Sequence, residues 1–165
     1  MGILARLIFA MVDFAARKGL AEPDSEASAK EQAQCTGIRG ETYAYWYLRR
    51  HGYTMVARNY LGPDIKGEID MVGYDGPVLA FVEVKTRSAP KPGNSDAGRP
   101  APEEAVNGEK RRNLARVARQ FIRSRRLESA PRRFDILAIE ARSSARPEVR
   151  LHKGAFNPRD NGRRE

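Results

Sequence analysis

Apolar and polar residues recur along this chain with periods that predict three helices and five strands. Apolar residues at helical spacing mark three segments, residues 3–16, 37–51 and 103–124. Runs rich in β-branched and aromatic residues, typical of strands, cover residues 53–60, 67–73, 78–87, 134–140 and 149–156. Two helices, three strands, a helix and two strands therefore follow one another, which predicts an α/β protein with a single core.

Residues 1–36 are expected to form an N-terminal amphipathic helix and a linker. The apolar run 7–12 is too short to span a membrane, and Asp13 interrupts it where a signal peptide would continue. The helix either docks on the domain or anchors the chain to a surface, and we expect docking. Residues 21–34 are small and polar, as in a linker or a weak helix start, and residues 157–165 are expected to form a disordered tail.

The composition of the chain predicts a class of binding partner and a cellular location. Thirty Lys and Arg against 21 Asp and Glu give the 165 residues a formal net charge of +9, so nucleic acid is the expected partner. With 41% apolar residues, the chain is not a disordered polyelectrolyte. One cysteine, Cys35, cannot form an intramolecular disulfide, which favours a cytoplasmic location.

Basic residues are concentrated on the helix expected at residues 103–124. Residues 110–126 contain Lys and Arg at many positions and no acidic residue. This helix is either a phosphate-binding surface or a solvated charged face. The candidate nucleic-acid-binding residues are Lys110, Arg111, Arg112, Arg116 and Arg119.

Acidic residues interrupt the two strands of a predicted hairpin, which a turn at residues 74–77 joins. Alternation of side chains puts Glu68 and Asp70 on one face of the first strand. On the second strand it puts Glu83 and Lys85 on one face. The group forms either cross-strand ion pairs on an exposed sheet face or an oxygen-ligand site for Mg²⁺.

The metal interpretation gives each of these residues a role. Asp70 and Glu83 would bind Mg²⁺ or Mn²⁺, and the backbone carbonyl of Val84 could supply a further ligand. Lys85 would orient or stabilise the hydroxide that attacks a phosphodiester. Glu41 lies on the apolar stripe of the helix at residues 37–51, where it either faces the core and needs a cation or hydrogen-bond donors, or reaches solvent at the edge of the stripe.

Seven short motifs give the chain a resemblance to a known family. In chain order they resemble motifs of the uncharacterised bacterial family typified by YraN, over about residues 37–156. That family is similar to the restriction-endonuclease-like superfamily, which includes archaeal Holliday-junction resolvases. The motifs are Gly40-Glu41, Arg58-Asn59-Tyr60, Gly67-Glu68-Ile69-Asp70, Phe81-Val82-Glu83-Val84-Lys85-Thr86-Arg87, Lys110-Arg111-Arg112, Arg133-Phe134-Asp135 and Lys153-Gly154-Ala155-Phe156.

This resemblance implies both a fold and an activity. The fold is a mixed central sheet of about five strands flanked by helices, formed by residues 37–156. Asp70, Glu83 and Lys85 correspond to a nuclease signature, and Glu41 corresponds to an acid from the first helix, which makes it a further catalytic residue and metal ligand. The activity implied is metal-dependent endonuclease hydrolysis of DNA, with branched or junction DNA among the substrates.

Two other classes of function compete with this one. The first is a non-catalytic nucleic-acid-binding module that keeps the nuclease scaffold. The second is an α/β enzyme acting on a small molecule, but the chain has no glycine-rich nucleotide-binding motif and its charge does not favour that class. Because every candidate ligand and Lys85 are present, we expect an enzyme. Cutting both strands of a symmetric junction would require two active sites and hence a homodimer.

Overall fold

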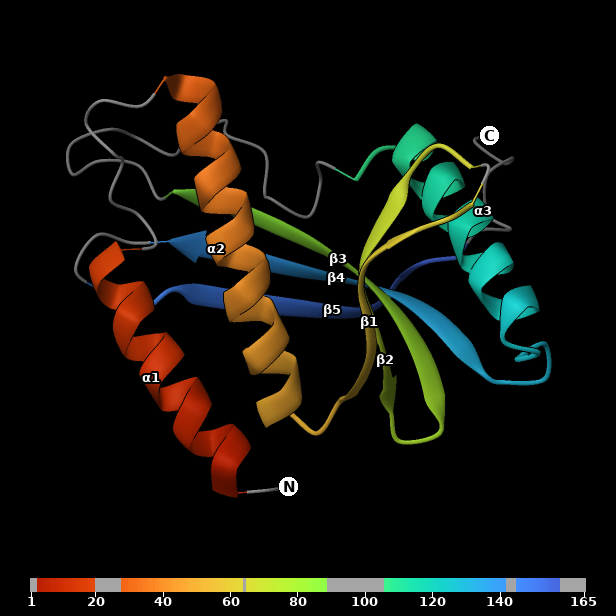
Figure 1. Ribbon diagram of the computed structural model, residues 1–165, viewed down its shortest axis with the longest axis horizontal. Coiled ribbons are helices and arrows are strands. Elements are labelled where there is room, and N and C mark those ends of the chain that lie inside the picture. The colour runs from red at the N-terminus through yellow and green to blue at the C-terminus, as the bar shows by residue number, and fades with distance from the viewer. Residues whose placement is uncertain (1–2, 20–27, 64, 89–105, 142–144, 158–165) are drawn as a thin grey trace, which may run out of the picture. The chain divides into compact units, whose positions relative to one another are not determined.

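The computed structural model describes residues 3–19, 28–63, 65–88, 106–141 and 145–157. Five strands form one sheet in the order β1-β2-β3-β4-β5. The pairs β1–β2 and β2–β3 are antiparallel, while β4 runs in the same direction as β3, so the sheet is mixed (Figure 1). The elements are α1 (Ile3–Gly19), α2 (Ala29–Arg50), β1 (Thr54–Leu61), β2 (Glu68–Asp75), β3 (Val78–Ser88), α3 (Gly108–Ser124), β4 (Arg132–Ala141) and β5 (Glu148–Phe156).

This architecture confirms the α/β fold class with a mixed five-stranded sheet, and it is consistent with a restriction-endonuclease-like fold. The helix starts differ from the predicted ones for a local reason. Ser28 and Glu31 form a capping box that starts α2 at Ala29, so the expected boundary between residues 36 and 37 falls inside this helix. Asn107 caps α3, which begins at Gly108 rather than at residue 103. Residues 21–27, 103–105 and 158–165 of the predicted segments lie outside the described residues.

The chain divides into two compact units. Unit 1 comprises Met1–His51, Val84–Ala105 and Leu137–Arg150, and unit 2 comprises Gly52–Glu83, Val106–Ile136 and Leu151–Glu165. Strands β3, β4 and β5 each contribute residues to both units. Each unit is described separately below.

In unit 1, α1 packs against α2 along one face. The ring of Phe9 meets that of Tyr43 edge to face at 5.5 Å, and the Tyr43 hydroxyl donates to Asp13 at 2.8 Å. Arg146 neutralises the buried Asp13 carboxylate through an ion pair of 2.8 Å. Burial and the hydrogen bond to Asp13 raise the pKa of Tyr43 above its ordinary value. The expected docking of the N-terminal helix is therefore confirmed.

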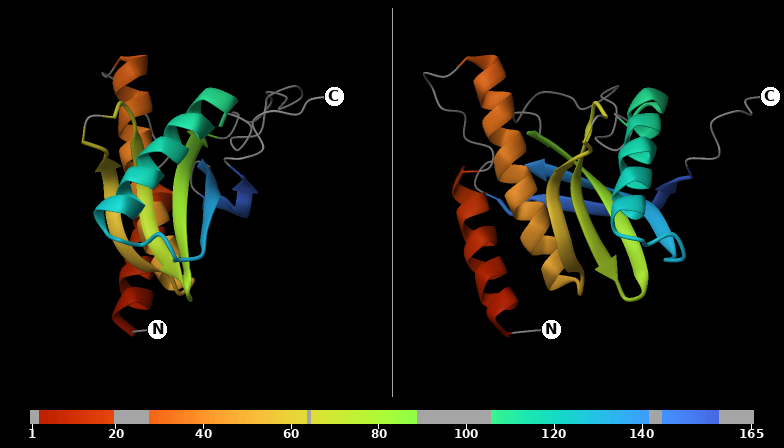
Figure 2. Two further views of the ribbon diagram at one scale, coloured as in Figure 1. Left: turned by 90° about the vertical axis from the view of Figure 1, so that its right-hand side faces the viewer. Right: turned by 45° about the vertical axis from the view of Figure 1, so that its right-hand side comes forward.

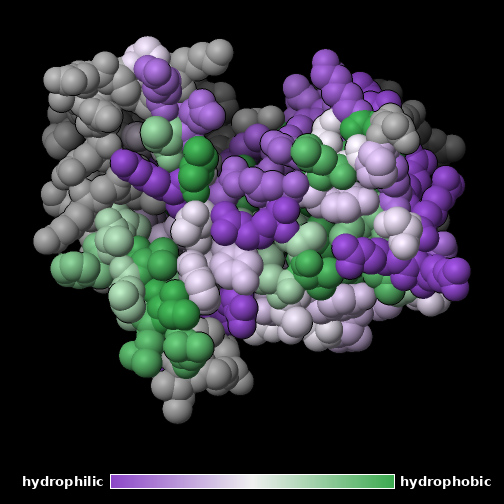
Figure 3. All heavy atoms as spheres, in the orientation of Figure 1, coloured by the Kyte–Doolittle hydropathy of each residue, from purple (hydrophilic) through white to green (hydrophobic). Residues whose placement is uncertain are grey.

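The opposite face of α1 stays exposed and apolar. Figure 3 shows it as green spheres at the lower left. The four large side chains on it are Leu4, Leu7, Met11 and Phe14. Within the described part of the chain, no helix combines the length and the apolar character needed to cross a membrane.

A second feature of unit 1 is the close approach of α2 to β3. A Cβ atom placed on Gly40 would lie 1.9 Å from Thr86 Oγ1 and 2.7 Å from Thr86 Cβ. No other residue type fits there without moving one of the two backbones. Gly40 therefore sets the distance between α2 and the end of β3 that follows Lys85.

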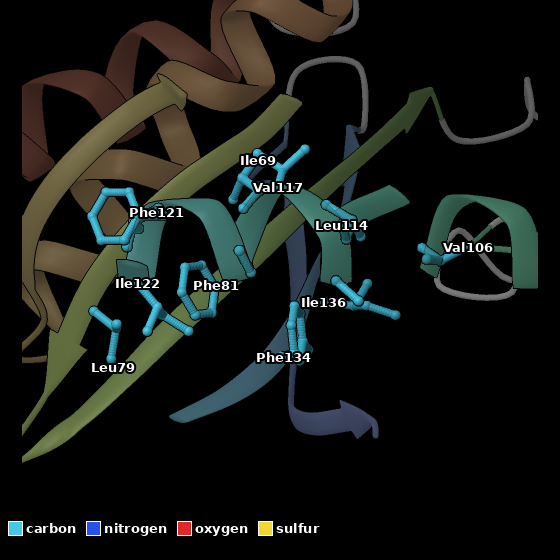
Figure 4. Packing of buried hydrophobic residues seen from close by; sticks show 13 residues of the cluster. Ile69, Leu79, Phe81, Val106, Leu114, Val117, Phe121, Ile122, Phe134 and Ile136 are labelled. Atoms are coloured by element: carbon cyan, nitrogen blue, oxygen red, sulfur yellow. The ribbon is translucent and has the colours of Figure 1, made fainter. Parts of the chain in front are cut away.

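The core of unit 2 lies between α3 and the sheet (Figures 2 and 4). The apolar stripe of α3 buries Leu114, Val117 and Phe121. Phe121 meets Phe81 edge to face at 5.9 Å, and Phe81 stacks on Phe134 at 5.4 Å. Each fully buried side chain of this size contributes about 1.5–3 kcal/mol. This packing fixes the position of α3, and hence of its first turn, over the strands of unit 2.

A charged network closes the other end of unit 2. Asp135 is fully buried and accepts hydrogen bonds from the Arg133 guanidinium at 2.9 Å and from the backbone N–H of Gly154 at 2.9 Å. Arg133 also pairs with Asp75, which Lys153 contacts at 2.7 Å. These ion pairs and hydrogen bonds tie the β2–β3 turn to β4 and β5, so Asp135 has a structural role.

We predict that Gly40→Ala destabilises the protein by about 1–3 kcal/mol, because the added methyl group overlaps Thr86. Gly37→Ala is the matched control, since it lies in the same helix with no atom within 4 Å of its new Cβ. That variant should gain about 0.5–1 kcal/mol from the lower entropy of its unfolded chain. Urea unfolding of both variants measures the difference. Equal stabilisation by the two substitutions would contradict the close packing at Gly40.

Candidate active site

Two buried carboxylates lie at neighbouring positions on β2 and β3. The antiparallel pairing runs from Asp75–Val78 to Met71–Val82, and Asp70 and Glu83 are the next residues on each strand. Asp70 is 8% exposed and Glu83 only 2%. The interpretation of these acids as surface ion pairs on an exposed sheet face is therefore wrong, because both carboxylates are buried.

A lysine from α3 provides the positive charge beside these carboxylates. The Nζ atom of Lys110 lies 3.2 Å from Glu83 Oε1. Burial on its own would lower the pKa of Lys110, but the charges of Glu83 and Asp70, the hydrogen bond to Glu83 and the charge of Glu68 together raise it. The residues Asp70, Glu83 and Lys110, all in unit 2, are called the carboxylate cluster below.

The sequence predicts that Lys110 belongs to a basic helix face, either phosphate-binding or solvated, and the structure places its ammonium group against Glu83. One feature of the sequence pointed to this position. Lys110 lies four residues before Leu114, so it continues the stripe that packs on the sheet. A cation at the end of a buried stripe needs an acidic partner, and the acids of the hairpin were available.

Lys85 follows Glu83 on the same strand, at the point where β3 enters unit 1. Thr86 lies against Gly40 of α2. Because successive side chains of a strand point to opposite faces, Lys85 and Glu83 share the face opposite Thr86. Lys85 is half-buried, and the carbonyl of Val84 lies on the backbone between these two side chains. The role of Lys85 in a Glu-x-Lys signature stays a prediction.

Glu41 belongs to unit 1, where it follows Gly40 on α2. Ala44 and Leu48 of the same stripe are completely buried, but Glu41 is half-buried. The structure thus places Glu41 at the edge of the buried stripe. Its role as a fourth acid of the site stays a prediction.

The carboxylate cluster has the chemistry that a hard divalent cation needs. Mg²⁺ prefers oxygen ligands, takes only one or two carboxylates in many enzymes and keeps several waters. Asp70 and Glu83 are buried carboxylates that already lie beside a cation, the Lys110 ammonium. Among the described residues, no group of three or more His, Cys, Asp or Glu is arranged to hold a metal. The donor set of this cluster, two carboxylates and the neighbouring Val84 carbonyl, suits Mg²⁺ or Mn²⁺.

The remaining candidate nucleic-acid-binding residues lie elsewhere on α3. Arg111 donates to the backbone carbonyl of Val106 at 2.9 Å and lies over the ring of Phe156. Arg112, Arg116 and Arg119 are exposed and face a cavity beside β4 and β5. The structure therefore separates Lys110 from the three exposed arginines, although all four belong to the same basic segment.

We predict that Lys110→Met destabilises the protein by about 1–3 kcal/mol at pH 7, because it removes the ammonium group that pairs with the buried Glu83 carboxylate. Arg123→Met, which removes an exposed charge from the same helix, should change stability by less than about 0.5 kcal/mol. Thermal unfolding of both variants provides the measurement.

The pH dependence of this loss has a definite sign. The folded-state pKa of Lys110 is raised, so its stabilising contribution is fully present below the unfolded-state pKa of about 10.4 and disappears as the pH rises through the folded-state pKa. The stability difference between wild type and Lys110→Met should therefore persist at pH 7–9 and shrink above that range. A variant as stable as wild type at pH 7 would show that Lys110 does not compensate the carboxylates.

Comparisons with known proteins place this chain in a family. The family described as "Uncharacterised protein family UPF0102" matches residues 40–139, which include Glu41, Asp70, Glu83, Lys85 and Lys110. A UPF0102 protein of Koribacter versatilis is 42% identical over 83% of this chain and 86% of its own length. UPF0102 proteins of Solibacter usitatus and Symbiobacterium thermophilum are 44% and 39% identical, each over 73% of this chain and over 84% and 95% of their own lengths. The chain therefore belongs to the uncharacterised protein family UPF0102, the restriction-endonuclease-like family typified by YraN.

Proposed function

We propose that this protein is a metal-dependent endonuclease that hydrolyses phosphodiester bonds in DNA. The observation that carries the proposal is the pair of buried carboxylates, Asp70 and Glu83, on neighbouring strands with Lys85 following on β3. Burying charges costs free energy unless they are paired or bind a metal. An apolar pair would pack this part of the sheet at lower cost, so the carboxylates point to a function. Membership of UPF0102 supports the scaffold and assigns no activity.

Each residue of the site would have a distinct role in hydrolysis. Asp70 and Glu83 would hold Mg²⁺ or Mn²⁺, with the Val84 carbonyl and Glu41 as further ligands. A divalent ion held there would lower the pKa of the attacking water and would neutralise negative charge on the phosphate. The Lys85 ammonium would position the attacking water and stabilise the charge that develops on the phosphoryl oxygens. The new bond from water oxygen to phosphorus replaces the bond to the leaving sugar oxygen, which takes up a proton.

DNA is the proposed substrate class because of the net charge of +9 and the exposed arginines of α3. We include branched and four-way-junction DNA among the proposed substrates because the family is similar to Holliday-junction resolvases. Cleavage of a symmetric junction would bring two copies of the active site together, so a homodimer is part of the proposal for that substrate.

One observation favours a second candidate, a non-catalytic nucleic-acid-binding module. Lys110 neutralises part of the charge of Asp70 and Glu83 from within the chain. The carboxylate cluster can therefore be a purely structural ion-pair group on a scaffold that binds DNA without cutting it. The two candidates differ in one property, which is a cleavage product that depends on a divalent metal.

We predict that Asp70→Asn and Glu83→Gln each reduce metal-dependent cleavage by about 100-fold or more, because the amides keep the shape but lose the anionic oxygens. DNA binding should stay equal or become tighter, since negative charge is removed. The assay uses duplex, single-stranded and four-way-junction DNA with Mg²⁺, Mn²⁺ or a chelator. Glu128→Gln, which removes an exposed acid, is the matched control and should cut like wild type. Cleavage by Asp70→Asn at the wild-type rate would assign the activity to another site or to a contaminant and would favour the non-catalytic module.

Lys85→Ala should separate metal binding from turnover. Because its ammonium is assigned to the water and the developing phosphate charge, its loss should lower kcat by about 100-fold and leave Mn²⁺ affinity within about twofold. Calorimetric Mn²⁺ titration and single-turnover cleavage measure the two properties on one preparation. Lys85→Arg restores the positive charge and should recover part of the rate. Loss of Mn²⁺ binding in Lys85→Ala would instead make Lys85 a structural support for the carboxylates.

A further inference from the structure

A large cavity lies in unit 2 on the flank of α3 that faces β4 and β5. Its volume is about 1080 Å³, and α3, the start of β4 and the end of β5 supply its walls. The acidic residues of the carboxylate cluster belong to β2 and β3, whereas the strands that line the cavity are β4 and β5. Two consecutive residues of α3 contact the two regions. Lys110 contacts Glu83 of the carboxylate cluster, and Arg111 lies over Phe156 of β5, which lines the cavity. One helix thus borders two separate sites.

The cavity walls are strongly basic. Arg112, Arg116 and Arg119 follow one another at i, i+4 and i+7 and share one face of α3, while Arg132 and Arg133 of β4 also line the cavity. Among the described residues that line the cavity, none is acidic. The basic face that the sequence predicts on this helix therefore forms part of the lining of a cavity. Figure 3 shows hydrophilic residues gathered over the right-hand region where Figure 1 draws α3.

The five arginines that line the cavity differ in whether an acidic residue neutralises their charge. Arg133 is neutralised by Asp75 and Asp135. Arg116 donates to the side-chain amide oxygen of Asn113, and Arg132 donates to the backbone carbonyl of Glu128 at 3.1 Å, so both keep their net charge. Within the part of the chain that the structure describes, the ion pairs at this cavity are those of Arg133. The remaining cavity arginines therefore keep a concentrated positive charge that an anion can neutralise.

Part of the cavity lining is apolar, and this part is called the floor below. It includes Phe134 and Phe156, whose rings stack at 4.9 Å, with small side chains such as Ala115 and Ala155 beside them. A site for inorganic phosphate alone would need only the arginines. Guanidinium groups on the walls and an apolar floor suit a ligand with both phosphates and organic groups, as in a chain of nucleotides.

We propose that this cavity is a binding site for a single nucleic-acid strand, separate from the carboxylate cluster. Arg112, Arg116 and Arg119 contact successive phosphates from one side, Arg132 contacts the backbone from the other, and sugars and bases cover the apolar floor. A duplex lying along α3 would use the three helical arginines without Arg132. The inference deepens the proposed function, since it makes single-stranded or branched DNA the substrate class.

The test compares two charge-matched double variants of the full chain. Arg119→Gln with Arg132→Gln removes one arginine from each wall, and Arg123→Gln with Arg126→Gln removes two exposed arginines outside the cavity. The probe is fluorescein-labelled dT20, with a 20-base-pair duplex for comparison. Binding is measured by anisotropy in a chelator over a range of NaCl concentrations, so cleavage plays no part.

The cavity variant should bind dT20 at least about tenfold more weakly, and its log–log salt slope should fall by about 1.4, because each phosphate contact on a single strand contributes about 0.7. The control variant should bind dT20 within about twofold of wild type, and the duplex should lose less affinity than dT20 in the cavity variant. Equal losses in the two variants would mean that only the overall charge matters, and the proposal would fail.

Two further measurements keep this outcome interpretable. Arg119→Lys with Arg132→Lys preserves the charge, so it should fold like wild type and still lose part of the dT20 affinity, because lysine cannot form the paired contacts of a guanidinium. Thymidine 5′-monophosphate should bind at least about 100-fold more weakly than dT20. Equal binding of the mononucleotide would assign the cavity to a free phosphorylated ligand and overturn the strand site.

The result can be separated from the fate of the proposed endonuclease. Asp70→Asn should bind dT20 in the chelator at least as tightly as wild type does, since Asp70 lies outside the cavity and the substitution removes a negative charge. Absence of cleavage by wild type together with dT20 binding through Arg119 and Arg132 would refute the endonuclease and keep the strand site. Metal-dependent cleavage with unchanged dT20 binding in the cavity variant would do the reverse.

Discussion

The ion pair between Lys110 and Glu83 is the interaction on which the interior of unit 2 depends. Two carboxylates, Asp70 and Glu83, are buried where the regular pairing of β2 and β3 ends, and the ammonium group of Lys110 compensates part of their negative charge. The Asn107 cap fixes where α3 begins, and the apolar stripe holds the helix on the sheet. The Asn107 cap, the apolar stripe and the ion pair therefore form together in only one register of α3.

That register also decides what the rest of α3 can do. With Lys110 turned toward β3, the arginines at positions 112, 116 and 119 are carried to the flank beside β4 and β5. A shift of one residue along the helix would rotate all of them by about 100° and break both groups at once. The carboxylates and the arginine-lined cavity are thus positioned by the same packing contacts.

The order and type of the elements could be predicted from the sequence because hydrophobic periodicity is a local property. Asp70, Glu83 and Lys85 could be selected because charged residues interrupt apolar strands. The contact between Lys110 and Glu83 could not be predicted, because composition alone does not distinguish the basic residues of α3 and this contact joins residues that are distant in sequence. Arg132 was missed for the same reason, since its place opposite α3 follows from the crossover between β3 and β4. The start of α2 at Ala29 depends on local sequence, namely the capping box of Ser28 and Glu31. It was not predicted because the segment that follows has weak helical character.

The anchoring of α1 has a consequence for how the protein is made. Asp13 enters the interior of unit 1 with Arg146 as its ionic partner, and 133 positions of sequence separate the two residues. On a ribosome the N-terminal segment emerges first, so this carboxylate cannot meet the Arg146 guanidinium until the 133 positions that separate them have been translated. During that time both the face of α1 that later packs on α2 and its outer apolar face can meet other molecules. The packing of α1 in unit 1 is therefore complete only after Arg146 has been synthesised.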